Sequence, residues 1–325
     1  MSMESVKIRV ERNTEIDLVK CPHILIGGST GSGKSYLMKS MLCDILERKE
    51  NRCKVIIIDP KSVDYQFLNS PIRRLTDEDM DQRMRFEGDT GSVEKVVGRG
   101  RKERKVICDE KSGGRYADWY WGFKGLGIVD RNGIEFGRAL NKIEELECEM
   151  GRRYELMKYF GFEEWGRFVE WADSVLKEDE YEGWNGICQS SECEELRTKF
   201  REVYGTEVEG RGDHFDRLVL IVDELTDLIY WDRDKSRGVF RGRVESGLVR
   251  LSMLGRAAGI HLILGTQRPD AQTLSGQLRA NIACRICLRV QSVMERRIVL
   301  GQSGNGSERE MVYQSELVSL ERALR

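Results

Sequence analysis

The chain has 325 residues, of which 40% are hydrophobic and 33% charged, with a formal net charge of -2 at pH 7. This length suits one large domain or two modest ones, and the charge balance offers no global basic field for nucleic acid. No apolar run reaches the roughly 18–20 residues that a membrane helix requires. The first twelve residues lack the apolar centre of a signal peptide, and nine scattered cysteines fit a reducing compartment. We therefore expect a cytoplasmic location.

The first strong signal is a glycine-rich loop between a predicted strand at 23–27 and a predicted helix at 36–48. The loop fits the pattern G-x-x-x-x-G-K-[ST], in which backbone N–H groups cradle phosphates. In this pattern the lysine reaches the β/γ-phosphates and the last hydroxyl binds Mg²⁺. A chance Lys-Ser pair after a glycine turn is the alternative, which the flanking elements disfavour. The residues predicted to bind ATP are Gly28, Ser29, Thr30, Gly31, Ser32, Gly33, Lys34 and Ser35.

Further apolar runs predict the sheet. Residues 54–58 form a β-branched run that ends at Asp59, and a strand that follows a helix makes a βαβ unit. Strands of a parallel sheet covered on both faces read as continuous apolar runs, as these do. We therefore predict an α/β fold with a mainly parallel sheet. A short strand is expected earlier, at 7–10.

Two stretches with weaker patterns, 70–122 and 160–212, are predicted to be insertions in a single domain spanning 1–325. The first contains a basic run at 95–105 and an aromatic cluster at 119–123. Such a combination is typical either of a DNA-contacting element or of a solvated surface with a local apolar patch, and we favour the second.

Regular elements flank and interrupt these stretches. Short strands are predicted at 106–108 and 127–129, and an amphipathic helical pattern covers 133–160. The stretch at 160–212 is acidic and predicts only helix fragments. Farther along, a helix is expected at 244–258.

A second decisive signal is the apolar run at 218–222, which ends in Asp223 and Glu224. This is the Walker B arrangement of P-loop NTPases. Asp223 would share the Mg²⁺ with Ser35, and Glu224 would orient and deprotonate the attacking water. Two carboxylates at the end of a buried strand favour hydrolysis over binding alone.

A further strand at 261–265 leads into Thr266 and Gln267, and we predict that Gln267 senses the γ-phosphate. The alternative is a strand-end amide that caps a neighbouring loop. The next predicted strand, 282–290, carries two cysteines three residues apart, which point to opposite faces and could not share a metal. A terminal helix or strand-helix is expected at 311–325.

Several of these stretches resemble one family in their order and residues. They include Glu-Met-Gly-Arg-Arg-Tyr at 149–154 and Gly-Arg-Ala-Ala-Gly-Ile-His-Leu at 255–262, which runs on to Thr-Gln-Arg-Pro at 266–269. With the P-loop, the Asp-Pro-Lys at 59–61 and the Walker B strand, they resemble the motor domain of the FtsK/SpoIIIE translocases within the HerA–FtsK superfamily. The resemblance covers most of residues 20–65, 124–160 and 215–302.

The resemblance implies a RecA-like P-loop NTPase core that forms a ring, expected to be hexameric, with ATP between subunits and DNA through the centre. It also implies an arginine supplied in trans. Arg285 is the first candidate, and Arg268, Arg256 and Arg153 are alternatives. Each of the four could instead be an ordinary surface or ion-pairing arginine.

The leading functional hypothesis is an ATP-driven DNA translocase. No membrane-spanning region or DNA-reading winged-helix domain is recognisable, which favours a mobile-element protein such as a conjugation coupling ATPase or a plasmid or phage translocase. A membrane-anchored or relaxase partner would suit such a role. The second hypothesis is a nucleotide-dependent switch or assembly factor that does not move DNA. A small-molecule kinase ranks last, because it would need neither Glu224 nor the Thr-Gln strand end.

Overall fold

The computed structural model describes residues 6–11, 14–48, 52–60, 72–73, 93–97, 104–108, 136–182, 190–206, 208, 215–230, 238–271, 273–301, 310–313 and 316–319. The predicted strand at 127–129, the aromatic cluster at 119–123 and the start of the long helix at 133–135 lie outside these residues. Most of the predicted insertion at 70–122 does so too.

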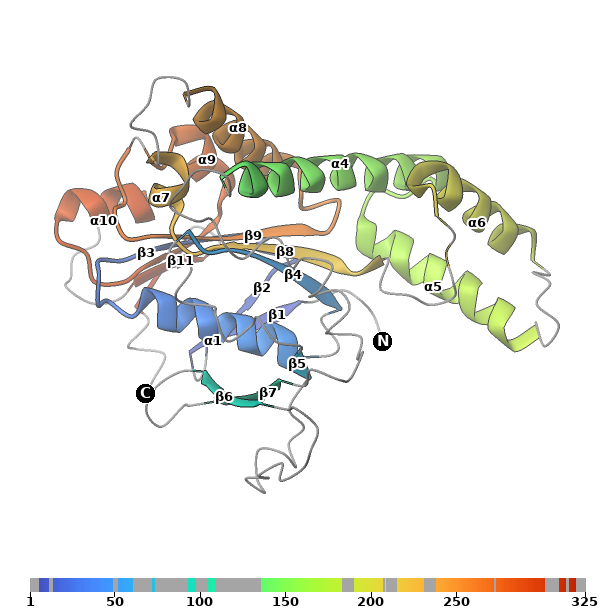
Figure 1. Ribbon diagram of the computed structural model, residues 1–325, viewed down its shortest axis with the longest axis horizontal. Helices are drawn as coiled ribbons and strands as arrows, with labels where there is room; N and C mark the ends of the chain where they lie inside the picture. Colours follow the sequence, from blue (N-terminus) through green and yellow to red (C-terminus); the bar gives the residue numbers. More distant parts are fainter. Residues whose placement is uncertain are drawn as a thin grey trace.

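A seven-stranded sheet forms the centre of the molecule (Figure 1). Its strand order is β12-β11-β10-β3-β9-β8-β4, and the five strands from β10 to β4 are parallel. Strand β9 therefore lies between the strand before the P-loop and the strand before the Walker B carboxylates. The parallel strands are β3 (His23–Gly27), β4 (Cys53–Ile58), β8 (Arg217–Val222), β9 (Ile260–Thr266) and β10 (Cys284–Cys287).

The sheet is buried on both faces, which is why its strands read as continuous apolar runs. In β8, Leu218, Leu220 and Val222 join the core cluster on one face, whereas Val219 and Ile221 join the cluster on the other. The same alternation places Cys287 and Cys284 in opposite clusters. No group of three or more potential metal ligands occurs among the described residues.

Helices cover these two faces (Figure 1). One face carries α1 (Lys34–Glu47) and a hairpin of β1 (Lys7–Glu11) and β2 (Thr14–Asp17). The other carries α4 (Phe136–Phe160), α7 (Leu225–Tyr230), α8 (Gly238–Leu254), α9 (Gly276–Asn281) and α10 (Val293–Leu300). The predicted strands at 7–10 and 23–27 and the helix that follows the glycine-rich loop are confirmed, whereas β2 was not foreseen.

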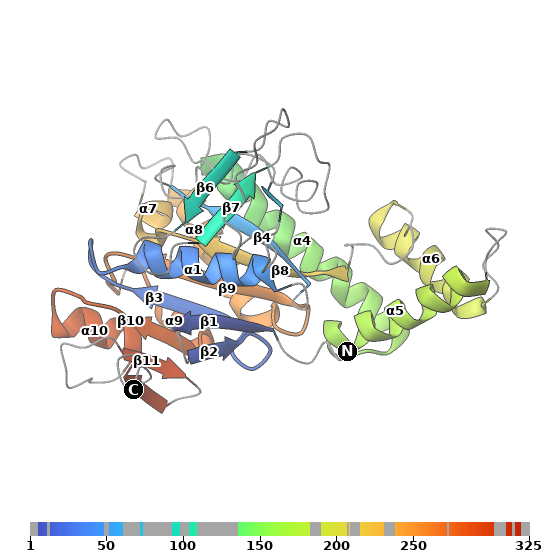
Figure 2. The same cartoon turned by 90° about the horizontal axis from the view of Figure 1, so that it is seen from below.

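The stretch at 160–212 contains two long helices rather than fragments, α5 (Trp165–Glu182) and α6 (Ser191–Tyr204). We call α5 and α6 the helical arm, because they extend beyond the sheet together with the end of α4 (Figures 1 and 2). The arm has a core of its own, in which Trp165 and Phe168 stack with ring centroids 4.9 Å apart. Phe200 and Phe215 complete its buried aromatic centre. These apolar positions were hidden in the sequence by the many acidic residues between them.

The ends of the sheet differ from prediction. Strands β11 (Glu310–Tyr313) and β12 (Glu316–Ser319) pair antiparallel, so a helix beginning at 311 is wrong, and residues 320–325 of the predicted element lie outside the described residues. Strand β10 is shorter than the predicted 282–290. A separate three-stranded sheet contains β5 (Ile72–Arg73), β6 (Val93–Val97) and the predicted β7 (Arg104–Cys108) (Figure 2). In the described part of the chain, no helix is both long enough and apolar enough to cross a membrane.

Candidate nucleotide-binding site

The glycine-rich loop lies where β3 ends and α1 begins, at the edge of the sheet opposite the helical arm (Figure 1). Gly31 has a φ of 77° and Gly33, at the helix N-cap, has a φ of 93°. A side chain would be strained at both positions, so the glycines permit the curl that turns backbone N–H groups inward. The N-terminus of α1 adds its partial positive charge at the same point. The predicted P-loop therefore has the backbone that phosphate binding requires.

The Lys34 side chain is almost fully buried and contacts the Walker B carboxylates. Its Nζ lies 3.2 Å from Asp223 Oδ1 and 3.9 Å from Glu224 Oε2, and it also donates to the backbone carbonyl of Asp223. Lys34 and Asp223 lie 189 positions apart in the sequence, yet the fold brings them into one ion-pair cluster. Because these carboxylates offset the lysine charge, an incoming phosphate must compete with them for Lys34.

Glu224 is fixed by the end of β9. The backbone N–H of Gln267 donates to both carboxylate oxygens of Glu224 at 3.0 Å. The hydroxyls of Thr226 and Thr266 lie 2.8 Å apart beside this contact. On its other side, Gln267 Oε1 accepts a hydrogen bond from the Thr30 hydroxyl at 3.0 Å. The Gln267 side chain thus hydrogen-bonds to the P-loop, as expected of an amide that caps a neighbouring loop. The Gln267 backbone hydrogen-bonds to Glu224.

The residues present fit a Mg²⁺ ion. Asp223 Oδ2 is buried and has no hydrogen-bond partner among the described residues, so an acceptor oxygen is left for another ligand. Ser35 lies in the first turn of α1, immediately after Lys34. Carboxylate and hydroxyl oxygens are hard donors of the kind that Mg²⁺ prefers.

Arg285, the first candidate for an arginine acting in trans, is engaged within its own chain. Its three guanidinium nitrogens donate to the carbonyls of Ile282 (2.9 Å), Leu300 (3.3 Å) and Arg279 (2.6 Å). These carbonyls stand at the C-terminal ends of α9 and α10, where carbonyl groups outnumber the backbone donors of the helix. Burial, followed by the nearby Arg279, lowers the pKa of Arg285. Arg285 thus binds two helix ends together.

The alternative arginines divide into two kinds. Arg153 is buried and donates to the carbonyls of Ala258 (2.9 Å) and Asp216 (2.8 Å). Arg256 and Arg268 are exposed. Arg268 follows β9 at the carboxyl end of the strand, beside the P-loop. Arg256 precedes β9, at the opposite end of the strand.

The two histidines predicted to belong to the core are buried, as expected. Burial lowers the pKa of His23 to about 3 and holds the pKa of His261 well below its usual value. Both rings are therefore neutral at physiological pH. They lie in β3 and β9 and take no part in the P-loop cluster.

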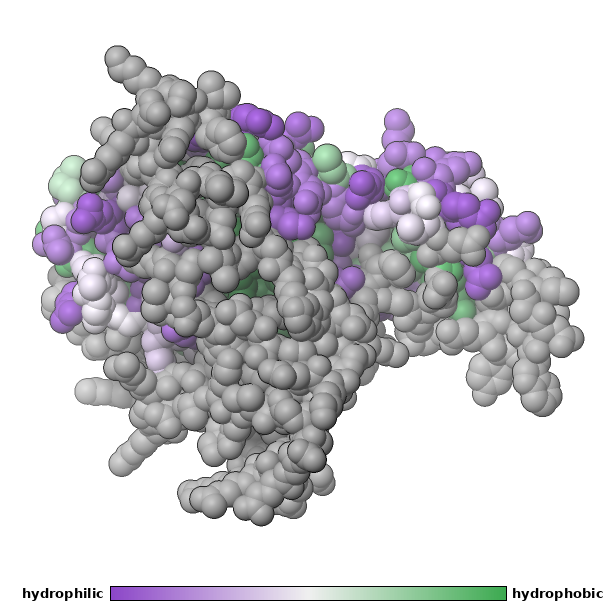
Figure 3. All heavy atoms as spheres, in the orientation of Figure 1, coloured by the Kyte–Doolittle hydropathy of each residue, from purple (hydrophilic) through white to green (hydrophobic). Residues whose placement is uncertain are grey.

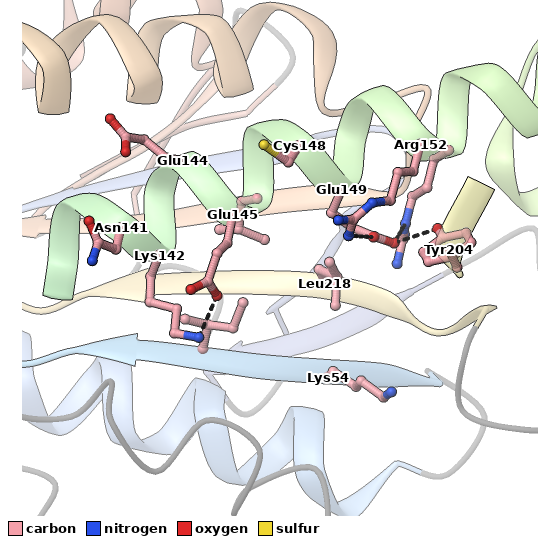
Figure 4. A pocket seen from close by; sticks show the side chains of 13 residues that line it. Lys54, Asn141, Lys142, Glu144, Glu145, Cys148, Glu149, Arg152, Tyr204 and Leu218 are labelled. Carbon is pink, nitrogen blue, oxygen red and sulfur yellow. Dashed lines mark hydrogen bonds and ion pairs between the residues drawn. The ribbon is translucent and has the colours of Figure 1, made fainter. Parts of the chain in front are cut away.

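A separate cavity of about 730 Å³ lies between α4, β4 and β8 (Figure 4). Lys142 pairs with Glu145 along its wall, and Tyr204 donates a hydrogen bond to Glu149 at 2.9 Å. None of the P-loop or Walker B residues lines it. The cavity is mixed in charge and is not the nucleotide site.

Fold and site together define a RecA-like P-loop ATPase core. The sequence profile of the FtsK/SpoIIIE family matches residues 4–87 and 133–271, which is more than half of the chain. The chain belongs to the FtsK/SpoIIIE family. The match runs through 160–212, whereas residues 88–132 lie outside it.

Individual relatives agree with the family. The chain is 27% identical over 291 residues to the DNA translocase FtsK of Treponema pallidum, a match that covers 89% of this chain and 24% of the relative. It is 28% identical over 289 residues to the DNA translocase SpoIIIE of Bacillus subtilis, with 89% and 25% covered. The chain thus spans about a quarter of the length of these relatives.

Solved structures share the fold. The conjugation coupling protein TcpA of pCW3, in its monomer form with ATPγS, matches with a TM-score of 0.56 and 21% identity, covering 98% of this chain and 65% of TcpA. The cytoplasmic domain of the type VII secretion ATPase EccC from Thermomonospora curvata matches with a TM-score of 0.50 and 18% identity. That match covers 97% of this chain and 28% of EccC.

Proposed function

We propose that the protein is an ATP-driven DNA translocase that serves the transfer of a plasmid, phage or conjugative element. The observation that carries the proposal is the cluster of Lys34, Asp223, Glu224 and Gln267 at one edge of the sheet. A protein that only bound nucleotide would need the lysine but not the second carboxylate. The resemblance to DNA translocases and to a conjugation coupling protein adds the DNA substrate.

In this proposal each residue has a separate task. Lys34 moves from Asp223 to the β/γ-phosphates. Ser35 and Asp223 would hold Mg²⁺, which would neutralise phosphate charge when bound. Glu224 accepts the proton of the attacking water. Gln267 responds to the γ-phosphate, because its side chain contacts Thr30 of the P-loop while its backbone contacts Glu224. Loss of the γ-phosphate would thereby be transmitted to β9.

We further propose that subunits assemble into a ring, with six copies as the expected number, and that one arginine completes the neighbour's site. Arg285 would have to release three carbonyls to do so. Arg268 and Arg256 are exposed and need no such release, so we place them ahead of Arg285. The single domain with insertions at 70–122 and 160–212, and a cytoplasmic location, belong to the same proposal.

Lys34→Ala tests the nucleotide site. The change removes a charge-assisted contact with the phosphates, and ATP affinity in the presence of Mg²⁺ should fall by at least about tenfold. Isothermal titration calorimetry measures the affinity directly, and circular dichroism checks that the fold persists. An unaltered dissociation constant would refute the assignment of this loop.

DNA should bind through local basic groups in the assembled ring. Two arginines of α8 are already paired with α4, since Arg243 contacts Glu144 and Arg250 Nε lies 3.8 Å from Glu147. Hydrophilic residues, in purple, predominate among the coloured residues in this part of the visible surface (Figure 3). We therefore expect weak binding by single subunits and tighter binding when a non-hydrolysable ATP analogue promotes assembly.

The experiment is fluorescence anisotropy with labelled duplex and single-stranded DNA across a salt series, alongside ATPase rates with each DNA. Affinity should fall with salt at a log–log slope of about -0.9 per phosphate contact on duplex DNA. Base preference should be slight, because backbone contacts carry no sequence information. If DNA neither binds at low salt nor stimulates ATP hydrolysis, the switch or assembly-factor function replaces translocation.

A further inference from the structure

Arg289 lies beside the P-loop, although it is no part of the loop's sequence pattern. It follows β10, which pairs in parallel with β3 so that Cys287 lies opposite Gly27. The pairing continues past the strand ends. The N–H of Leu288 donates to the carbonyl of Gly27, and the N–H of Ser29 donates to the carbonyl of Arg289, both at 2.8 Å. The backbone of Arg289 is thus held against the first residues of the loop.

The side chain of Arg289 reaches farther along the loop. A Cβ built on Gly31 would lie 3.9 Å from Nη2 of Arg289, so the guanidinium stands over the turn of the loop. Arg289 is exposed, and its guanidinium has no hydrogen bond or ion pair with any residue in the described part of the chain. The loop is therefore flanked on one side by Gln267, through Thr30, and on the other by this arginine.

The charges around the loop indicate what Arg289 would bind. The Lys34 charge is offset by Asp223 and Glu224, whereas no described carboxylate offsets Arg289. The N-terminus of α1 adds further positive potential. Placing a guanidinium beside this positive potential is unfavourable unless an anion is bound there. The forked N–H donors of the guanidinium match the geometry of phosphate oxygens. A polyphosphate chain would satisfy both the loop and the arginine.

We propose that Arg289 binds the polyphosphate of the nucleotide that lies in its own subunit's P-loop. This inference rests on the proposed nucleotide site and adds a binding residue to it. Arg289 acts in cis, unlike the arginine supplied by a neighbour, because its backbone is bonded to Ser29 of the same loop. The recognised group is the phosphate chain rather than the base.

The test compares ATP with inorganic tripolyphosphate, which has the phosphate chain without ribose or base. Calorimetry with Mg²⁺ gives both affinities for the wild type, Arg289→Ala, Arg289→Lys and a control, Arg167→Ala. Arg167 is an exposed arginine of the helical arm, far from the loop. We expect Arg289→Ala to weaken both ligands on the order of tenfold and by similar factors. The affinities of Arg289→Lys should lie between those of Arg289→Ala and the wild type, because lysine keeps the positive charge but lacks the forked donors of the guanidinium. Arg167→Ala should match the wild type.

Two outcomes overturn the proposal. Unchanged affinity in Arg289→Ala excludes a phosphate contact, and weakened ATP binding with unchanged tripolyphosphate binding assigns Arg289 to the ribose or base. Lys34→Ala, measured in parallel, separates this inference from the nucleotide site itself. If Lys34→Ala loses affinity and Arg289→Ala does not, only the role of Arg289 fails. If neither variant loses affinity, the site is wrong. Should Arg289→Ala not fold, Arg289→Lys decides by the same comparison.

Discussion

Glu224→Gln should bind ATP but lower its turnover by ~10²-fold or more, because the amide cannot accept the proton of the attacking water. The change should leave the fold intact. In the wild type, the backbone N–H of Gln267 donates to both carboxylate oxygens of Glu224. The side-chain oxygen of a glutamine at position 224 can still accept this hydrogen bond. Lys34 keeps its shorter contact with Asp223. The effect should therefore appear in the rate constant and spare binding.

The measurement is phosphate release at saturating ATP, with ATP affinity from calorimetry on the same preparation. Asp227→Asn is the matched control, since Asp227 lies three residues farther on, in α7, and has no place in the cluster. It should hydrolyse ATP at the wild-type rate. Wild-type turnover in Glu224→Gln would remove the glutamate from the mechanism and leave the translocase proposal without its chief support.

The parts of the fold that the sequence predicts are those with a local physical cause. Strands that are buried on both faces are apolar along their length. The strands β3, β4, β8 and β9 can therefore be predicted from uninterrupted apolar runs in the sequence. A strand of four residues such as β10 carries less signal, and its predicted length was too great. The C-terminal hairpin is short, and its pairing with β10 is a long-range property that no local pattern encodes.

The candidate site divides in the same way. Lys34 and Glu224 belong to local motifs, but the contacts of Thr226 with Thr266 and of Gln267 with Glu224 arise only because β9 lies between β3 and β8. Both threonines lie beside predicted motif residues, but no local pattern indicates that their hydroxyls meet. Arg289 falls within the predicted strand at 282–290, where its sequence context assigns it no role. The pairing of β10 with β3 places it beside the loop.

Arg153 shows how a family motif can be structural. It lies on α4 within the Glu-Met-Gly-Arg-Arg-Tyr stretch, yet it is 1% exposed. Its guanidinium bonds to Glu149 at 2.9 Å and stands 4.5 Å from the ring centroid of Trp165. It also donates to the carbonyl of Ala258, in the turn before β9. Arg153 therefore connects Trp165 of the helical arm to the turn before β9.

Arg153→Ala should lower the free energy of unfolding by ~3–5 kcal/mol, because it takes a donor from the buried carbonyl of Ala258 and from the part-buried carbonyl of Asp216, and removes the nearest cationic partner of Glu149. Arg153→Lys should recover only part of this loss, since one ammonium cannot replace the guanidinium fork. Arg152→Ala is the matched control. The Arg152 side chain is 49% exposed and 3.6 Å from Glu149, so its loss should cost under ~1 kcal/mol. Urea titrations followed by circular dichroism and tryptophan fluorescence give the three values. Equal midpoints for Arg153→Ala and Arg152→Ala would show that the buried guanidinium does not hold the arm to the sheet.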